Sequence, residues 1–243
     1  MQVLRHNRSR PLPQLPALHV VVVGRSPELA QYTVDLISAE GGTAVAHPAD
    51  VTKEADCSSI VKATIERYGR LDCLHNNVGG GRQPGNIVSI DLDTWRKMFA
   101  LNIESILMMS KYAIPAMIET ARGGSIVNIS SLRAIRPLNS TAYTAAKGAV
   151  MALSRSMAVD HGPQGIRVNC LVVGPVFTPS VARTQNVTQE KRAMRAKISL
   201  LGIEGSGWDV GYTVRFLLSE QSRYLTGQCI VLDGGVSTIG PAR

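Results

Sequence analysis

Two neighbouring stretches, Ile126-Val127-Asn128-Ile129-Ser130-Ser131 and Ser140-Thr141-Ala142-Tyr143-Thr144-Ala145-Ala146-Lys147, indicate the fold class most directly. The first is an apolar run that ends in Ser130-Ser131, and it predicts a strand over 125–129. The second predicts a helix over 141–162 that carries Tyr143 and Lys147 on one face, four residues apart. A nearby ammonium lowers the pKa of a phenol, because positive charge favours the phenolate. The pair therefore predicts a tyrosine that transfers protons near neutral pH.

The same alternation of strand and helix continues along the whole chain. Helices are expected over 27–40, 52–68 and 209–219, with Thr52 as the N-cap of the second, and a short and then a long helix over 93–120. Further strands are expected over 20–23, 43–49, 71–74, 167–172 and 228–232, and residues 180–207 form a polar, helical insertion. This order predicts an α/β fold in three layers, a parallel sheet with helices on both faces.

Bulk composition narrows the class of protein. The 243 residues are 44% apolar, which suits one globular domain. The net charge is +8, but the basic residues are dispersed and only 5% of residues are aromatic, so no nucleic-acid partner is expected. No apolar run approaches the ~20 residues of a membrane span. Four scattered cysteines without metal-ligand spacing predict free thiols in the cytoplasm and no metal site: Cys57, Cys73, Cys170 and Cys229.

Nine short segments, taken in order, resemble the short-chain dehydrogenase/reductase family. The resemblance runs from about His19 to Gly235 and implies a Rossmann-like sheet and a nicotinamide-dependent oxidoreductase. It also implies a homodimer or homotetramer, formed by the helices over 93–120 and 141–162. The segments are Asp50-Val51-Thr52, Gly69-Arg70-Leu71-Asp72, Asn76-Asn77-Val78-Gly79, Leu101-Asn102, Ile126 to Ser131, Tyr143-x-x-x-Lys147, Arg167-Val168-Asn169, Gly174-Pro175-Val176-x-Thr178 and Leu232-Asp233-Gly234-Gly235.

By this resemblance, Tyr143 is the general acid/base, and Lys147 lowers its pKa and binds the ribose hydroxyls of the cofactor. A serine would hold the substrate oxygen. Ser131 occupies the usual place at the end of the strand, whereas Ser130 has the usual separation of 13 residues from Tyr143. We prefer Ser131, because the strand fixes its direction and the loop can absorb one deletion. Asn102 would bend a helix and hold a water that relays protons to Lys147.

Further residues would contact the cofactor if the resemblance holds. Asn76 would line the adenosine side of the cleft, and Asp50 would accept a hydrogen bond from the adenine amine. Lys111 lies where the family often has a basic residue on the long helix. Val176 and Thr178 would meet the nicotinamide carboxamide.

The start of the chain departs from the family pattern. Residues 1–23 contain no glycine, so the first strand and the glycine-rich phosphate turn are missing or replaced, and 20–23 corresponds to the second strand. We expect residues 1–18 to form an atypical basic leader with several prolines, and 19–243 a single Rossmann-like domain. Arg25, just after that strand, offers a cation to a ribose 2′-phosphate, which favours NADP over NAD.

The leading hypothesis is therefore an oxidoreductase that transfers a hydride between NADP(H) and a ketone or secondary alcohol. The alternative is a catalytically impaired family member that acts as a binding or scaffold subunit. It follows from the expected gap in the middle of the sheet, which would leave an unpaired strand edge.

Overall fold

The structure, a computed structural model, describes residues 18–81, 83–179, 181–182 and 188–238. Contacts within the chain group into two compact units, 1–49 and 50–243, and each is described by itself. The leader expected over 1–18 falls almost wholly outside the described residues. The single domain expected over 19–243 stays a prediction.

The first unit is one strand–helix–strand crossover. Strand β1 (His19–Gly24) and strand β2 (Thr43–Pro48) are parallel, and His19 pairs with Thr43. Helix α1 (Pro27–Ala39) connects them. The side chain of Ser26 caps its first turn by accepting a hydrogen bond from Leu29 N at 3.2 Å.

The second unit is built on a parallel sheet with the strand order β3-β4-β5-β8. The strands expected from the sequence are present, and so are the helices expected over 27–40, 52–68, 141–162 and 209–219, with bounds that differ by at most two residues. The range 93–120 holds a short and a long helix joined by a π-helical turn, and the expected insertion contains the described helix 189–197. Among the described helices, none is both long and apolar enough to cross a lipid bilayer. The remaining elements are α2 (Glu54–Tyr68), β3 (Cys73–Asn76), α3 (Leu92–Phe99), α4 (Ser105–Ala121), β4 (Gly124–Ser131), α5 (Thr141–His161), β5 (Ile166–Val173), β6 (Val176–Phe177), α7 (Gln189–Lys197), β7 (Gly205–Ser206), α8 (Gly207–Leu218) and β8 (Cys229–Leu232).

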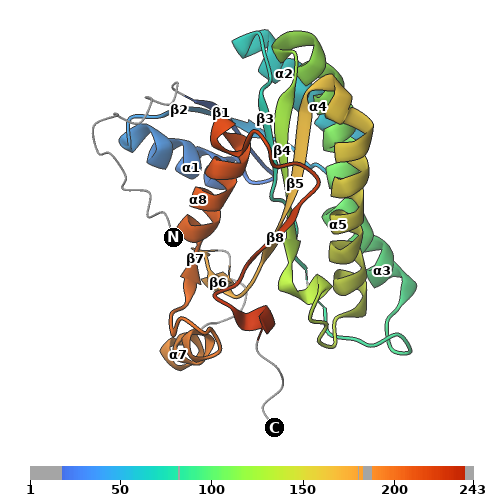
Figure 1. The fold of residues 1–243 in the computed structure, drawn as a ribbon, viewed down its shortest axis with the longest axis vertical. Helices are drawn as coiled ribbons and strands as arrows, with labels where there is room; N and C mark the ends of the chain where they lie inside the picture. The colour runs from blue at the N-terminus through green and yellow to red at the C-terminus, as the bar shows by residue number, and fades with distance from the viewer. Residues whose placement is uncertain (1–17, 82, 180, 183–187, 239–243) are drawn as a thin grey trace, which may run out of the picture. The chain divides into compact units, whose positions relative to one another are not determined.

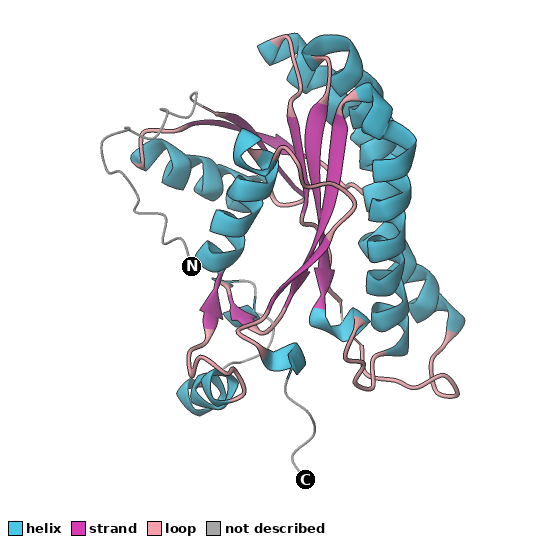
Figure 2. Cartoon of the chain, viewed as in Figure 1, coloured by secondary structure: helices cyan, strands magenta, loops and turns pink. Residues whose placement is uncertain are grey.

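Helices cover both faces of the four-stranded sheet, as predicted. Helices α4 and α5 lie on one side and α8 on the other (Figure 1; Figure 2). On β5, Cys170 and Val172 pack with residues of α4 and α5, whereas Leu171 packs with residues of α8. Successive side chains of a strand point to opposite faces, so this alternation places apolar residues in two core layers. The three-layer α/β arrangement is confirmed.

Each unit has its own parallel strand pairing. Strand β1 pairs with β2 in the first unit, and β3 pairs with β4 in the second. The expected absence of the family's first strand stays a prediction.

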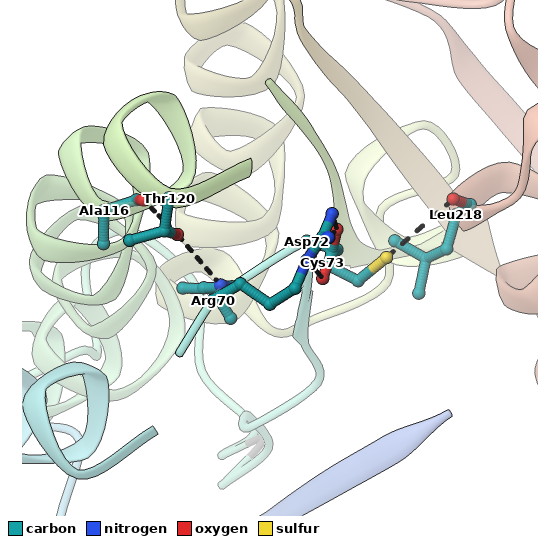
Figure 3. Close-up of polar contacts among 7 residues, drawn as sticks. Arg70, Asp72, Cys73, Ala116, Thr120 and Leu218 are labelled. Atoms are coloured by element: carbon teal, nitrogen blue, oxygen red, sulfur yellow. Dashed lines mark hydrogen bonds and ion pairs between the residues drawn. The ribbon is translucent and has the colours of Figure 1, made fainter. Parts of the chain in front are cut away.

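The bounds of β3 differ from the prediction of 71–74. Leu71 N donates to Thr120 Oγ1 of α4 at 3.1 Å, so this amide is already used before the ladder begins. Pairing with β4 starts where Cys73 meets Ser125. Figure 3 shows Thr120 of α4 and Leu218 of α8 near the start of this strand, where Cys73 Sγ lies 3.9 Å from Leu218 O.

The expected N-cap at Thr52 is also wrong. Helix α2 has Lys53 as its N-cap, without a side-chain hydrogen bond. The hydroxyl of Thr52 donates instead to Asp50 Oδ1 at 2.7 Å, and Thr52 N donates to the same oxygen at 3.1 Å. The aspartate thus takes both donors into a local turn, a use of Asp that competes with capping.

The partly buried guanidinium of Arg167 binds carbonyl groups at the carboxyl end of α8 and in the turn that follows it. From β5, Arg167 Nη1 donates to Leu217 O at 3.0 Å and to Ser222 O at 3.1 Å, and Nη2 donates to Ser219 O at 3.1 Å. The last carbonyls of a helix lack partners within the helix, so an external cation both satisfies them and suits the helix dipole.

We predict that Arg167→Ala lowers the free energy of unfolding by about 3 kcal/mol, because several partly buried carbonyls lose a charged donor at once. Arg167→Lys should recover only part, since one ammonium cannot reach both sets of acceptors. Urea unfolding followed by circular dichroism measures both. Arg155→Ala, at an exposed position of α5, is the control and should change little. Equal effects at the two positions would contradict this role.

Candidate active site

The site is centred on one face of α5. Lys147 Nζ lies 5.9 Å from the centre of the Tyr143 ring, as the spacing of four residues predicts. The same Nζ donates to Ile129 O of β4 at 2.9 Å. The helix therefore presents the phenol and the ammonium side by side, next to the carboxyl end of the central strand.

Burial changes the chemistry of Lys147. The residue is only 3% exposed, and this burial lowers its pKa from 10.5 to about 8. Removal from water penalises the charged form of a lysine. With a pKa of about 8 the ammonium still predominates at pH 7, so a positive charge persists beside Tyr143.

Asn102 lies in a short π-helical turn, Ala100–Glu104, between α3 and α4. Its Oδ1 accepts from Gly80 N at 2.9 Å, and its Nδ2 donates to Gly80 O at 3.1 Å and to Met98 O at 3.0 Å. The asparagine therefore fastens the loop that follows β3 to this turn. Its roles in bending a helix and in relaying protons through water stay predictions.

Gly79 is where that loop meets the two polar side chains. A Cβ atom at this position would lie 2.8 Å from Lys147 Nζ and 2.9 Å from Asn102 Oδ1. Both distances are shorter than real Cβ contacts, so any larger residue would displace one of the two side chains. A glycine therefore allows the loop, the lysine and the asparagine to converge.

The two serine candidates differ in their contacts. Ser130 is buried, and its Oγ donates to Lys147 O at 2.7 Å. Ser131 is partly exposed, and its Oγ accepts from Arg133 N at 3.2 Å. The hydroxyl of Ser130 thus braces the helix that carries Lys147, whereas that of Ser131 acts as an acceptor in its turn.

Asn76 belongs to a buried chain of amides and hydroxyls that the sequence did not predict. Its Nδ2 donates to Asn128 Oδ1 at 2.8 Å, and Asn128 Nδ2 donates to Ser154 Oγ at 2.9 Å. The chain crosses from β3 through β4 to α5 beside the site. Asn128 lies in a quoted motif, and its polarity inside an apolar strand was the available signal.

Two further cofactor candidates, Asp50 and Lys111, contact neighbouring polar side chains. The carboxylate of Asp50 accepts from Thr52. The ammonium of Lys111 binds the carboxylate of Glu54 on α2 at 2.7 Å, in an exposed ion pair.

Val176 and Thr178 lie on and just after β6. Val176 O accepts from Arg195 Nη2 at 2.9 Å, and Thr178 Oγ1 accepts from Val181 N at 3.2 Å. Arg25 directly follows β1 in the first unit.

Comparison with known proteins gives consistent matches along most of the chain. Residues 17–237 match a family model described as enoyl-(acyl carrier protein) reductase. The chain is 34% identical over 225 residues to the 7alpha-hydroxysteroid dehydrogenase of Bacteroides fragilis, covering 91% of this chain and 86% of that one. It is 31% identical over 224 residues to 2-(S)-hydroxypropyl-CoM dehydrogenase 3 of Xanthobacter autotrophicus, covering 90% and 87%.

Solved structures match to the same extent. A short-chain type dehydrogenase/reductase from Mycobacterium ulcerans has a TM-score of 0.83 and 31% identity, over 90% of this chain and 81% of that one. A 7 alpha-hydroxysteroid dehydrogenase, in complex with NADH and 7-oxo glycochenodeoxycholic acid, has a TM-score of 0.81 and 30% identity, over 89% and 84%.

The lowered pKa of Lys147 predicts a pH-dependent stability. Between pH 8 and 10.5 the unfolded chain keeps a proton that the folded protein has released, so stability rises with pH in that window. The free energy of unfolding of the wild type, relative to Lys147→Met, should therefore increase by about 3 kcal/mol across it.

Urea unfolding of both proteins at several pH values measures this difference, in which the other titrating groups cancel. Lys62→Met is the matched control, because the Lys62 side chain is 77% exposed. A difference between wild type and Lys147→Met that stays flat across the window would show that Lys147 keeps an ordinary pKa.

Proposed function

Because the chain belongs to the short-chain dehydrogenase/reductase family, whose members are oxidoreductases that use nicotinamide cofactors, we propose that it transfers a hydride between NADP(H) and a ketone or secondary alcohol. The observation that carries the proposal is the buried ammonium of Lys147, 5.9 Å from the centre of the Tyr143 ring. Few structural roles call for a buried lysine without a carboxylate partner, whereas a proton-transferring phenol benefits from one.

In reduction, the carbonyl carbon gains the hydride that the bound nicotinamide supplies. Tyr143 gives its phenolic proton to the carbonyl oxygen, and in oxidation it takes the proton from the alcohol. Lys147 stabilises the phenolate that remains, because its charge lies next to the ring. Asn102, which holds Gly80 on both its N–H and its C=O, fixes the loop beside the lysine and would hold the relay water.

We assign the substrate oxygen to Ser131. Ser130 Oγ already uses its proton in the bond to Lys147 O, whereas Ser131 Oγ is an acceptor in its bond to Arg133 N. A hydroxyl that accepts one bond can still donate its proton to a substrate oxygen. Ser130 then supports the helix behind the lysine.

The described residues fit the nicotinamide half of a cofactor. Gly79 leaves the space beside Lys147 free of a Cβ, and a lysine there would bind the ribose hydroxyls. Val176 and Thr178 would meet the carboxamide, Asn76 would line the adenosine side, and Asp50 would bind the adenine amine. Lys111 remains a candidate for cofactor binding as a basic residue on the long helix.

The choice of NADP rests on Arg25, which follows β1 directly after Gly24. A guanidinium binds a 2′-phosphate well, while an acid at that place would select the unphosphorylated ribose. The related hydroxysteroid dehydrogenase was solved with NADH, so NAD is the competing cofactor in any test.

A second copy of the chain is part of this proposal. Between α4 and α5 lies a hollow of about 300 Å³, lined by apolar residues that include Leu107, Ile114, Leu153 and Met157. Apolar surface shared by two helices suits a twofold interface in a homodimer or homotetramer. The cysteines are free thiols, which supports a cytoplasmic location.

The experiment that tests the function is a fluorescence titration with NADPH and NADH, followed by Tyr143→Phe in any activity found. We expect Tyr143→Phe to lower kcat by about 10²-fold or more while the dissociation constant of the cofactor changes little, because a general acid/base contributes about that much. Retained turnover would move proton transfer to another residue. Absence of binding up to millimolar cofactor would favour the scaffold alternative.

The proposed cofactor preference predicts the outcome of Arg25→Asp. The variant should shift the NADP/NAD ratio of kcat/KM toward NAD by about 10²-fold, since a 2′-phosphate would lose a cation and meet a like charge. Steady-state rates with both cofactors measure it. Arg155→Ala serves as the control for loss of one positive charge, and an unchanged ratio in Arg25→Asp would show that Arg25 does not contact the cofactor.

A further inference from the structure

Helix α7 is held to the rest of the second unit in an unusual way. None of its residues is buried, and its largest apolar side chain, Met194, is 67% exposed. Burial of an apolar face is what ordinarily fixes a helix of this length. The attachment of α7 must therefore come mainly from polar contacts.

Those contacts converge on one carboxylate. The side chain of Glu204 is only 7% exposed, and its Oε2 accepts from Arg192 Nε at 2.8 Å. Its Oε1 lies 3.2 Å from Arg195 Nε, an ion pair without hydrogen-bond geometry. Two guanidiniums from successive turns of α7 thus neutralise a carboxylate that is otherwise shielded from water.

The same two arginines also contact β6. Arg195 Nη2 donates to Val176 O at 2.9 Å, and the Arg192 guanidinium lies 3.9 Å from the centre of the Phe177 ring. Glu204 directly precedes β7, which pairs with β6 through Val176–Gly205 and Phe177–Ser206. Since β6 has only two residues, its own ladder gives it few bonds, and the arginines add contacts at both of its positions.

We propose that Arg195 and Glu204 are positioning residues, which hold α7 against β6 so that Val176 and Thr178 present a fixed backbone to the nicotinamide carboxamide. The inference rests on the proposed function, in which Val176 and Thr178 contact the cofactor. Arg195 acts through Val176 O, and Glu204 acts by holding the guanidinium in the orientation that this bond requires. Arg192 shares the carboxylate and stacks on Phe177, so it gives partial redundancy.

The ion pair between Arg195 and Glu204 determines which variants test the proposal. Glu204→Gln keeps the shape of the side chain but leaves two guanidiniums without a negative partner. Arg195→Ala removes both the ion pair and the bond to Val176 O. Arg195→Lys retains a charge for Glu204, but a single ammonium cannot also reach the carbonyl in the same geometry. Arg96→Ala is the matched control, because Arg96 forms an exposed ion pair with Asp93 on α3.

The experiment measures two properties of each full-length variant: the dissociation constant of NADPH and NADH by fluorescence, and hydrogen exchange of the amides in 176–178 and 189–197. For Arg195→Ala and Glu204→Gln we expect the dissociation constant of the preferred cofactor to rise about tenfold, with kcat changed by less than about twofold, and exchange to accelerate in those two segments alone. Arg195→Lys should fall between, and Arg96→Ala should match the wild type.

The outcomes distinguish the positioning role of the two residues from the proposed cofactor-dependent function. Unchanged affinity in both variants, or faster exchange spread over the whole chain, would overturn the positioning role. If the wild type binds neither cofactor, the proposed function fails, and the exchange data alone then decide whether the arginines hold β6. Exchange in the two segments equal to that of Arg96→Ala would refute that contact as well.

Discussion

The buried ammonium of Lys147 places the strictest demand on this structure, because a charge removed from water must be stabilised by the protein itself. The chain meets that demand with a backbone carbonyl, Ile129 O, at the end of the longest pair of strands. Two further residues near the lysine support this arrangement. Ser130 holds the carbonyl of the same residue, and Gly79 leaves it space. Strand β4, helix α5 and the loop after β3 therefore meet at the ammonium of Lys147.

Much of this arrangement could be predicted from local sequence. The β-branched stretches gave the strands, because parallel strands buried on both faces have a simple apolar pattern. The spacing of Tyr143 and Lys147 gave their shared face, because helix geometry alone determines it. Asn102 lies in a π-helical turn, and the bend expected there stays a prediction.

What could not be predicted depends on partners far along the chain. The bond from Leu71 N to Thr120 delays the start of β3, and a residue 49 positions away leaves no local signal. The link from Asn76 to Asn128 and Ser154 likewise forms only after three elements have packed. The sequence predicts Thr52 as a helix N-cap, but in the structure its hydroxyl donates to Asp50 instead of capping the helix. Such competition between nearby acceptors has no reliable pattern in sequence.

The contacts of Arg167 set an order of events during synthesis of the chain. Its acceptors lie 50 to 58 residues later, at the end of α8 and in the turn before β8. When β5 leaves the ribosome, the guanidinium has none of these partners, and the strand that will cover the edge of β5 does not yet exist. At about 5–20 residues per second, this interval lasts on the order of 10 s. Until α8 and β8 have been made, we expect a nascent chain to expose an apolar strand edge beside a guanidinium that lacks its later partners, which favours transient association with other chains.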